Sequence, residues 1–336
     1  MKDVSVIVPI YNKEAFLDQS LNSLLNGVGK DSEILLIDDH STDQSFFIAE
    51  DFAKRDSRIR LLRNKVNRGV SYTRNKGIKE AKGKYIGFFD ADDQVDYGFY
   101  DKLCQSAASI DITPDIIVGG FNCIDVNHLE IVFPTLSILV DGVPFSLQRR
   151  KFASGETFSC CNKIYHRDFL EKKYFPDYIK EDIYFHYWTM KTASKVLEHR
   201  ETKYYYHPQE DGRNFSYYNL PNGDFYSFVE GYQWLQQKIG NDQYYLSSFH
   251  KAVEQAFYGY IQSITSWHIS FDDQVDLIGT MIDYCTRVHH MDLSHLDVVS
   301  LNYYKFYQKK YSETSLEDLT KKLNRLSFNY PRRKRR

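Results

Sequence analysis

The stretch YIGFFDADD, residues 85–93, passes from an apolar run directly into three carboxylates within four positions. A short apolar run of this kind predicts a buried β-strand. The preceding residues, 72–81, suit a helix, and Gly83 is placed to cap its end. The same alternation extends back to the N-terminus, with strands expected at 58–62, 33–37 and 4–10 and helices at 46–53 and about 16–25. This order predicts an α/β domain with a mainly parallel sheet and helices on both faces.

Three polar turns follow strands of the predicted sheet. Tyr11-Asn12 follows the first strand, Asp38-Asp39 the second, and the acidic turn 90–93 the fourth. Ligands of open α/β sheets bind at the carboxyl ends of the strands. We therefore expect these turns to meet on one rim of the sheet.

The acidic turn has three interpretations. Clustered carboxylates repel one another unless a cation shares them, and Mg²⁺ or Mn²⁺ binds carboxylates together with substrate phosphates. The structural alternative is a solvated turn that caps the next helix. A strand ending in D-x-D also resembles the aspartyl-phosphate phosphatases, in which the first Asp is the nucleophile. Those enzymes usually carry the motif on their first strand, whereas here it follows the fourth.

The composition excludes several classes of protein. A net charge of −2 is not that of a nucleic-acid binder. The five cysteines form no C-x-x-C pair, which argues against a disulfide framework or a structural zinc site, and Cys160-Cys161 suits buried packing. No stretch approaches the ~20 apolar residues of a membrane span, and the N-terminus does not resemble a signal peptide. We therefore expect a cytoplasmic protein.

Four segments then occur in a specific order: VSVIVPIYN at 4–12, EILLIDDHSTD at 33–43, NRGVSYTRNKGIKEAKGKYIGFFDADD at 67–93 and KEDIYF at 180–185. Together they resemble the family 2 inverting glycosyltransferases of bacterial capsule, cell-wall and glycoprotein synthesis. The resemblance is strong over residues 3–100 and weaker to about 216. It implies the Rossmann-like GT-A fold and transfer of a hexose or N-acetylhexosamine from a UDP-sugar to a glycan hydroxyl. It also implies Mn²⁺ or Mg²⁺ as cofactor.

The resemblance assigns the donor-binding roles. Pro9 and Tyr11 would line the nucleoside pocket, and Asp39 would accept a hydrogen bond from the uracil imide, while Asp38 supports the turn. Asp92 would be the main metal ligand. The complete donor set that it implies is Pro9, Tyr11, Asn12, Asp39, Arg74, Asn75, Asp90 and Asp93.

Within that set, four positions carry more specific expectations. Arg74 would lie near the diphosphate, and Asn75 would contact the nucleotide or hold the loop. Asp90 would reach the ribose or the metal. Asp93 would face the acceptor or the donor sugar.

Asp182, next to Glu181, matches the general base of the family. It would take the proton from the acceptor hydroxyl as that oxygen attacks the anomeric carbon, so that the anomeric configuration inverts. A positioned base contributes roughly 10²–10⁴-fold to the rate. A helix N-cap before Ile183 is the structural alternative, and the two roles are compatible.

Three further positions follow from the resemblance. Lys163, in the stretch NKIY, would shape the donor-sugar or acceptor site, and Glu181 would also belong to the acceptor site or its loop. His207 would contact the metal or the phosphates, or else simply pack. Arg213, with Ser216, would belong to a loop that closes over the diphosphate.

The chain divides by pattern into a nucleotide-sugar-binding half (1–105), an acceptor-binding half (106–216) and a mainly helical C-terminal region (217–336). The last region is a candidate oligomer interface or acceptor surface. Its five terminal basic residues, 332–336, suit either peripheral contact with anionic lipid or a polyanionic acceptor, or a disordered tail. The acceptor would be a lipid-linked, cell-wall or protein-linked glycan. A non-catalytic nucleotide-sugar-binding module and a phosphatase-like hydrolase remain alternative functions.

Overall fold

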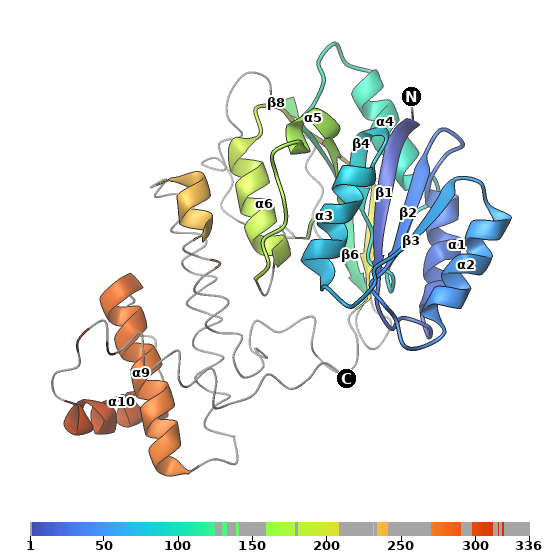
Figure 1. The fold of residues 1–336 in the computed structure, drawn as a ribbon. Coiled ribbons are helices and arrows are strands. Elements are labelled where there is room, and N and C mark those ends of the chain that lie inside the picture. Colours follow the sequence, from blue (N-terminus) through green and yellow to red (C-terminus); the bar gives the residue numbers. More distant parts are fainter. Residues whose placement is uncertain are drawn as a thin grey trace. The chain divides into compact units, whose positions relative to one another are not determined.

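The computed structural model of the chain describes residues 2–124, 130–132, 139–140, 159–178, 181–207, 231, 234–240, 270–289, 298–311, 315 and 318. By its contacts the chain divides into two compact units (Figure 1). The first comprises residues 1–210 and 237–240, and the second comprises residues 211–236 and 241–336.

The described part of the first unit is built on a ten-stranded sheet in the order β3-β2-β1-β4-β9-β6-β10-β5, with β7 beside β6 and β8 beside β10. Its strands are β1 (Lys2–Ile10), β2 (Glu33–Asp38), β3 (Ile59–Arg63), β4 (Gly83–Phe88), β5 (Gln94–Val95), β6 (Ile116–Ile124), β7 (Glu130–Val132), β8 (Leu139–Val140), β9 (Lys163–His166) and β10 (Val196–Tyr206). Its helices are α1 (Leu17–Gly27), α2 (Ser45–Arg55), α3 (Val70–Glu80), α4 (Phe99–Ala108), α5 (Arg167–Leu170) and α6 (Glu181–Thr192).

Strands β1 to β4 form a parallel block. β1 pairs with β2 on one side and β4 on the other, and β2 pairs with β3. All six residues of β2 and the run Val4–Val8 of β1 are buried. Such runs do not alternate with polar residues because helices cover both faces of a parallel sheet. The expected strand–helix order is confirmed here.

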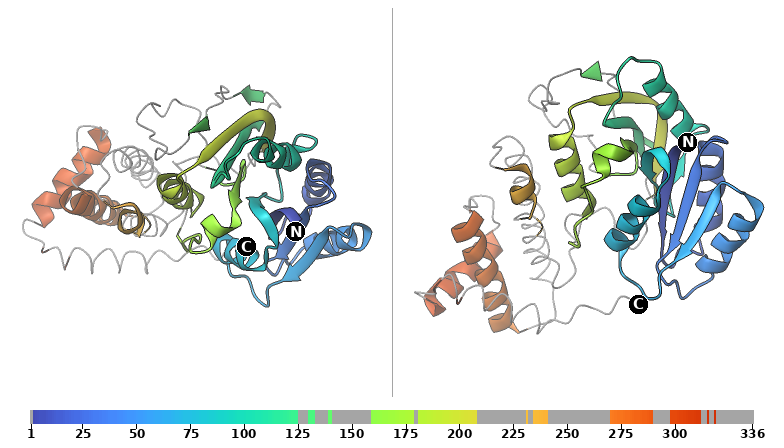
Figure 2. Two further views of the ribbon diagram at one scale, coloured as in Figure 1. Left: turned by 90° about the horizontal axis from the view of Figure 1, so that it is seen from above. Right: turned by 45° about the horizontal axis from the view of Figure 1, so that its top comes forward.

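The helices of this block lie on opposite faces of the sheet (Figure 2). The crossovers from β1 to β2 and from β2 to β3 run in one direction across the sheet, whereas the crossover from β3 to β4 returns past β1. Right-handed crossovers therefore place α1 and α2 on one face and α3 on the other. On its face, α3 packs against β1 and β2.

The other half of the sheet is mixed. β9 pairs antiparallel with both β4 and β6, while β6 and β10 are parallel. The short β5, which follows the acidic turn, pairs antiparallel with β10. The sequence predicted the α/β class but none of these antiparallel pairings. They bring the end of β10 next to the acidic turn.

The prediction that Gly83 caps the helix before it is wrong. Helix α3 ends with Ala81 at its C-cap, and Gly83 is the first residue of β4. There it pairs with Lys2, and a Cβ on Gly83 would collide with the backbone nitrogen of Ser5. The glycine is required by close approach of two strands, not by a turn.

In the second unit, two helices are described, α9 (Phe271–His289) and α10 (Val298–Lys310). They pack on each other, and Gly279 of α9 leaves room for the Tyr307 ring of α10, with which any added Cβ would clash. The expected helical character of the C-terminal region is confirmed for these residues. None of the helices in the described ranges is long and apolar enough to cross a membrane.

We predict that Gly83→Ala lowers the free energy of unfolding by about 1–3 kcal/mol, because the backbone around Ser5 must shift to admit a methyl group. Chemical denaturation would measure the change. The matched control is Lys84→Ala, at the next position on the same strand, where the side chain is exposed. Equal stability of the Gly83→Ala variant and the wild type would contradict the close-approach explanation.

Candidate active site

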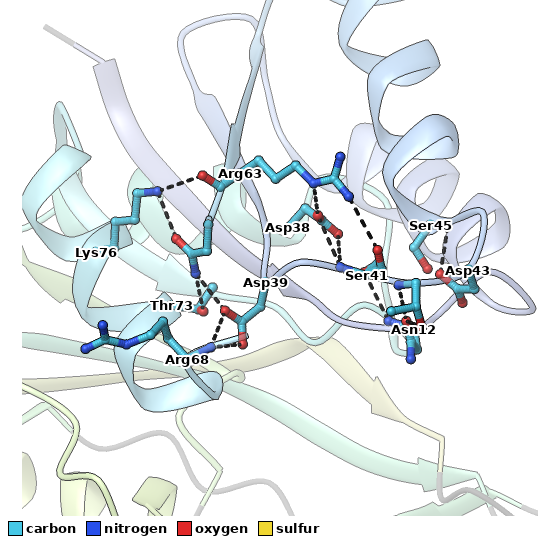
Figure 3. Close-up of polar contacts among 12 residues, drawn as sticks. Asn12, Asp38, Asp39, Ser41, Asp43, Ser45, Arg63, Arg68, Thr73 and Lys76 are labelled. Atoms are coloured by element: carbon cyan, nitrogen blue, oxygen red, sulfur yellow. Dashed lines mark hydrogen bonds and ion pairs between the residues drawn. The ribbon is translucent and has the colours of Figure 1, made fainter. Parts of the chain in front are cut away.

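The loops after β1 and β2 are joined at the carboxyl ends of their strands (Figure 3). The Asn12 side-chain oxygen accepts the Thr42 N–H at 2.9 Å, and the Asn12 N–H donates to the Ser41 hydroxyl at 3.2 Å. Asn12 has a φ of 51°, a left-handed conformation that asparagine tolerates better than most residues. The expected meeting of the polar turns on one rim is confirmed for these two loops.

Pro9 and Tyr11, expected at the nucleoside, lie at this rim. Pro9 pairs with Ile37 across β1 and β2, and both Pro9 and Tyr11 are partly exposed. Their position leaves them available to a ligand at the end of β1, and their contact with a nucleoside stays a prediction.

Asp38 supports the turn after β2. It is fully buried, its carboxylate accepts the Ser41 N–H at 3.2 Å, and Arg63 forms an ion pair with it at 3.0 Å. Figure 3 shows Asp38 between these two partners. The arrangement fits the supporting role expected for this residue.

The Asp39 carboxylate holds the loop that begins α3. It accepts the backbone N–H groups of Arg68 at 2.9 Å and Gly69 at 2.7 Å, and the Asn64 side-chain amide at 2.8 Å. Gly69 has a φ of 86°, which favours glycine, and it is the N-cap of α3. Asp39 is therefore 3% exposed and held at the rim. Its expected contact with uracil stays a prediction.

Two carboxylates of the acidic turn are paired with cations from distant segments. Asp92 lies 2.5 Å from the ammonium nitrogen of Lys13, in the loop after β1. Asp90 lies 2.7 Å from the guanidinium of Arg74, on α3. Burial raises the pKa of Asp92, and the charge of Lys13 opposes that shift. The third polar turn thus joins the same rim.

The helix-cap interpretation of the acidic turn is wrong. The turn leads into the short strand β5, and the next helix, α4, begins at Phe99 with Gly98 at its N-cap. The carboxylates therefore lie several residues before that helix, and neither Asp90 nor Asp92 can cap it.

Asp93 ties the acidic turn to the end of β10. It is 1% exposed, and its carboxylate accepts the Tyr204 hydroxyl at 2.6 Å and the His207 backbone N–H at 2.9 Å. The Tyr204 hydroxyl in turn accepts the Asp90 N–H at 3.1 Å. Burial, and next the charges of Asp92 and Asp90, raise the pKa of Asp93 well above its ordinary value. This geometry favours a structural role, and the sugar contact expected of Asp93 stays a prediction.

The carboxylates of the acidic turn fit a divalent cation only in part. Among the described residues, no group of three or more His, Cys, Asp and Glu side chains could hold a metal ion alone. A magnesium-type site in phosphoryl chemistry, however, needs only one or two carboxylates together with substrate phosphates. Asp90 and Asp92 meet that requirement, and Lys13 currently occupies one oxygen of Asp92. The metal role of His207 stays a prediction.

Arg74 and Asn75 connect α3 to the segment before α6. Arg74 is 4% exposed, and its guanidinium lies between Asp90 and Glu181, at 2.6 Å from the Glu181 carboxylate. The Asn75 side chain donates to the Phe175 carbonyl and accepts the Phe175 N–H, both at 2.8 Å. Asn75 thus holds a loop, which is one of the two roles expected for it.

Asp182 lies in the first turn of α6, which begins at Glu181, so the alternative of an N-cap before Ile183 is wrong. It is partly exposed, and its negative charge contributes to the raised pKa of the buried Tyr184. The Arg74–Glu181 ion pair therefore places the expected base one residue away from a side chain bound to Arg74. The function of Asp182 as a base stays a prediction.

Lys163 and the two neighbouring cysteines are buried. The Lys163 ammonium donates to the Ser159 carbonyl and to the Asn162 side chain, each at 2.7 Å. Cys160 and Cys161 are free thiols whose sulfurs lie 3.8 Å apart, which confirms the buried packing expected of them. Arg213, together with Ser216 and the basic residues 332–336, lies outside the described residues.

Three residues of the rim were not foreseen: Lys13, Asn64 and Tyr204. Lys13 directly follows the first polar turn, which was expected on the same rim as the three carboxylates. A cation at that position was the signal that could have identified it. Tyr204 gave none, because it contacts Asp93 from 111 positions away. Asn64 likewise reaches Asp39 from the end of another strand.

Comparison with known proteins places this geometry in a family. The uncharacterized glycosyltransferase EpsJ of Bacillus subtilis is 46% identical to this chain over 118 residues. These residues are 35% of this chain and 33% of EpsJ. The poly(ribitol-phosphate) beta-glucosyltransferase of Bacillus spizizenii is 30% identical over 68% of this chain and 36% of its own length. The chain thus spans about a third of the length of these curated relatives.

A solved structure has the same fold. The crystal structure of S. aureus TarS residues 1–349 in complex with UDP superposes with a TM-score of 0.63 at 22% identity, over 93% of this chain and 91% of the other. A TarS complex with UDP-GlcNAc superposes with a TM-score of 0.58. These likenesses confirm the GT-A type of α/β fold.

The family description "Glycosyl transferase family 2" matches residues 5–173, which is 169 of the 336 residues. That range includes all three polar turns, helix α3 and the buried Asn162–Lys163 segment. On this match, the chain belongs to glycosyl transferase family 2.

Proposed function

We propose that the protein is an inverting glycosyltransferase, which moves a hexose or N-acetylhexosamine from a UDP-sugar to a hydroxyl of a glycan acceptor. The observation that carries the proposal is the pair of contacts of Arg74, which binds Asp90 of the acidic turn and Glu181, the residue before Asp182 in α6. Donor and base are thereby expected on adjoining parts of one rim.

A uridine nucleotide as donor is supported by the TarS complexes with UDP and UDP-GlcNAc, and by Asp39 at the end of β2. A cell-surface polymer as acceptor is supported by two relatives. One is the poly(ribitol-phosphate) beta-glucosyltransferase, and the other is the minor teichoic acid biosynthesis protein GgaB of Bacillus subtilis, 30% identical over 62% of this chain. Peripheral contact with a membrane would involve residues 332–336.

In the proposed reaction, the acceptor oxygen attacks the anomeric carbon while the bond from that carbon to the diphosphate oxygen breaks on the opposite side. Asp182 accepts the acceptor's hydroxyl proton. Asp90 and Asp92 would hold a Mn²⁺ or Mg²⁺ ion, which supplies Lewis-acid stabilisation of the negative charge on the departing diphosphate. Lys13 and Arg74 keep positive charge at the acidic turn.

The phosphatase alternative has no support from this geometry. Its nucleophile would be Asp90, whose carboxylate is bound by Arg74. The family match covers the D-x-D segment within a glycosyltransferase pattern. The non-catalytic alternative predicts UDP binding without turnover and is separated by the experiments that follow.

We predict that Asp182→Asn retains UDP affinity but lowers the transfer rate by roughly 10²–10⁴-fold, because the amide cannot accept the acceptor proton. Calorimetry with UDP and a UDP-release assay measure the two quantities. Asp177→Asn is the matched control, because Asp177 is an exposed carboxylate a few residues earlier. Transfer by Asp182→Asn at the wild-type rate would show that the base lies elsewhere.

A second prediction concerns the cation at Asp92. Lys13→Met should tighten Mn²⁺ binding in the absence of nucleotide, because the ammonium group no longer competes for the Asp92 oxygen. Electron paramagnetic resonance of free Mn²⁺ measures the affinity directly.

In the same titration, Asp92→Ala should weaken Mn²⁺ binding, and Lys65→Met, which removes an exposed lysine, should leave it unchanged. Identical Mn²⁺ affinity in the wild type, Lys13→Met and Asp92→Ala would overturn the assignment of Asp92 as a metal ligand.

A further inference from the structure

We propose that helix α3 is a positioning element that fixes the catalytic helix α6 relative to the donor carboxylates, and that the Arg74–Glu181 ion pair is the contact through which it acts. Arg74 and Glu181 are positioning residues in this scheme, and the group they position is Asp182. The inference rests on the proposed function, because it concerns the proposed base.

One face of α3 contacts residues just before α6 and the first residue of α6. The Ser71 hydroxyl donates to the Pro176 carbonyl at 2.8 Å, Asn75 bonds both backbone groups of Phe175, and Arg74 binds Glu181. The three α3 residues are spaced three and four positions apart, or adjacent, and so share one side of the helix. Their partners lie about 100 positions later in the chain, in the segment that leads into α6 and its first turn.

Other contacts join α3 to the turn after β2 and to the acidic turn 90–93. Asp39 accepts the Arg68 and Gly69 N–H groups at the start of the helix. The Asn64 amide that binds Asp39 also donates to the Thr73 hydroxyl at 3.1 Å. Arg74 itself binds Asp90. Helix α3 is therefore bound to Asp39, to the acidic turn through Asp90, and to the start of α6 through Glu181.

The geometry at Arg74 demands a guanidinium. Its two terminal nitrogens contact different carboxylates, at 2.7 Å to Asp90 and 2.6 Å to Glu181, and its carbon lies 5.1 Å from the centre of the Phe175 ring. A planar fork can satisfy two carboxylates and stack on a ring, whereas a lysine offers a single point charge. Because the group is 4% exposed, loss of one carboxylate leaves buried charge unbalanced.

The contact should therefore affect the chemical step more than nucleotide binding. Glu181 is adjacent to Asp182 in the first turn of α6, so a change at Glu181 alters the orientation of that turn. A displacement of about 1 Å at a reacting group can lower the rate by roughly 10²-fold. Nucleotide contacts expected at Asp39 and Tyr11 lie on other loops and should be retained.

The test is a double-mutant cycle on the full chain, with kcat, KM and UDP affinity measured for each variant. Glu181→Gln keeps the shape of the side chain and removes its charge. We expect its kcat to fall by about 10–100-fold with KM for the donor and UDP affinity unchanged. In the Arg74→Met background, the same Glu181→Gln change should cause no further fall in kcat, because the pair acts as a unit.

The matched control is Glu80→Gln. Glu80 is on the same helix and pairs with Arg60 at 3.0 Å, but it is exposed and at the far end. It should have wild-type kcat. If Glu181→Gln does not fold, Glu181→Asp, which retains the charge on a shorter side chain, should reproduce the fall in kcat with unchanged UDP affinity.

Three outcomes would overturn the inference. Wild-type kcat in Glu181→Gln and Glu181→Asp would show that the ion pair does not position the base. Equal fold losses from Glu181→Gln in the wild-type and Arg74→Met backgrounds would show that the two residues act independently. No UDP release by the wild-type protein with any donor would overturn the proposed function as well, which distinguishes the two failures.

Discussion

The rest of the site depends on the burial of one guanidinium, that of Arg74, between Asp90 and Glu181. Burial alone would lower the pKa of Arg74, but the surrounding negative groups hold it well above its ordinary value, so the side chain stays charged. Because the buried Arg74 stays charged and must remain paired, it restricts the positions of the Asp90 and Glu181 carboxylates. The acidic turn, helix α3 and helix α6 are consequently fixed relative to one another.

The acidic turn illustrates a wider requirement for charge balance. Three carboxylates within four positions would repel one another, and each is bound by a different element: Asp90 by α3, Asp92 by the loop after β1, and Asp93 by Tyr204 of β10. The turn is thus held by three distant parts of the chain. Its two carboxylates nearest to cations, Asp90 and Asp92, are the ones proposed for the metal, because a divalent ion can replace or supplement their present partners.

The sequence predicted the parallel half of the fold because β1 and β2 are covered on both faces and therefore appear as mainly apolar runs. It could not predict the mixed half, because the four-residue β9 and the two-residue β5 are too short to show a period. Gly83 was misassigned for a related reason. The need for glycine there comes from Ser5 on a neighbouring strand and leaves no local signal.

At the site, the sequence identified the turns but not what holds them. Asp39 and Arg74 were expected at the donor and lie at the rim, and their contacts with the donor stay predictions. Their bonds to Gly69 and Glu181 depend on tertiary pairing that no spacing reveals. Asp93 was expected to face the acceptor or the donor sugar, but the fold buries it against Tyr204, whereas Asp92 faces Lys13.

Inverting transfer from a UDP-sugar is tested by a screen of UDP-sugars with Mn²⁺ and a panel of hydroxyl acceptors. The anomeric configuration of the product is read from its proton NMR coupling. In-line displacement with Asp182 as base should release UDP from an α-linked donor and give a product of β configuration. A product that retains the α configuration would contradict the in-line displacement with Asp182 as base. UDP binding without transfer to any acceptor would contradict the proposed enzymatic function.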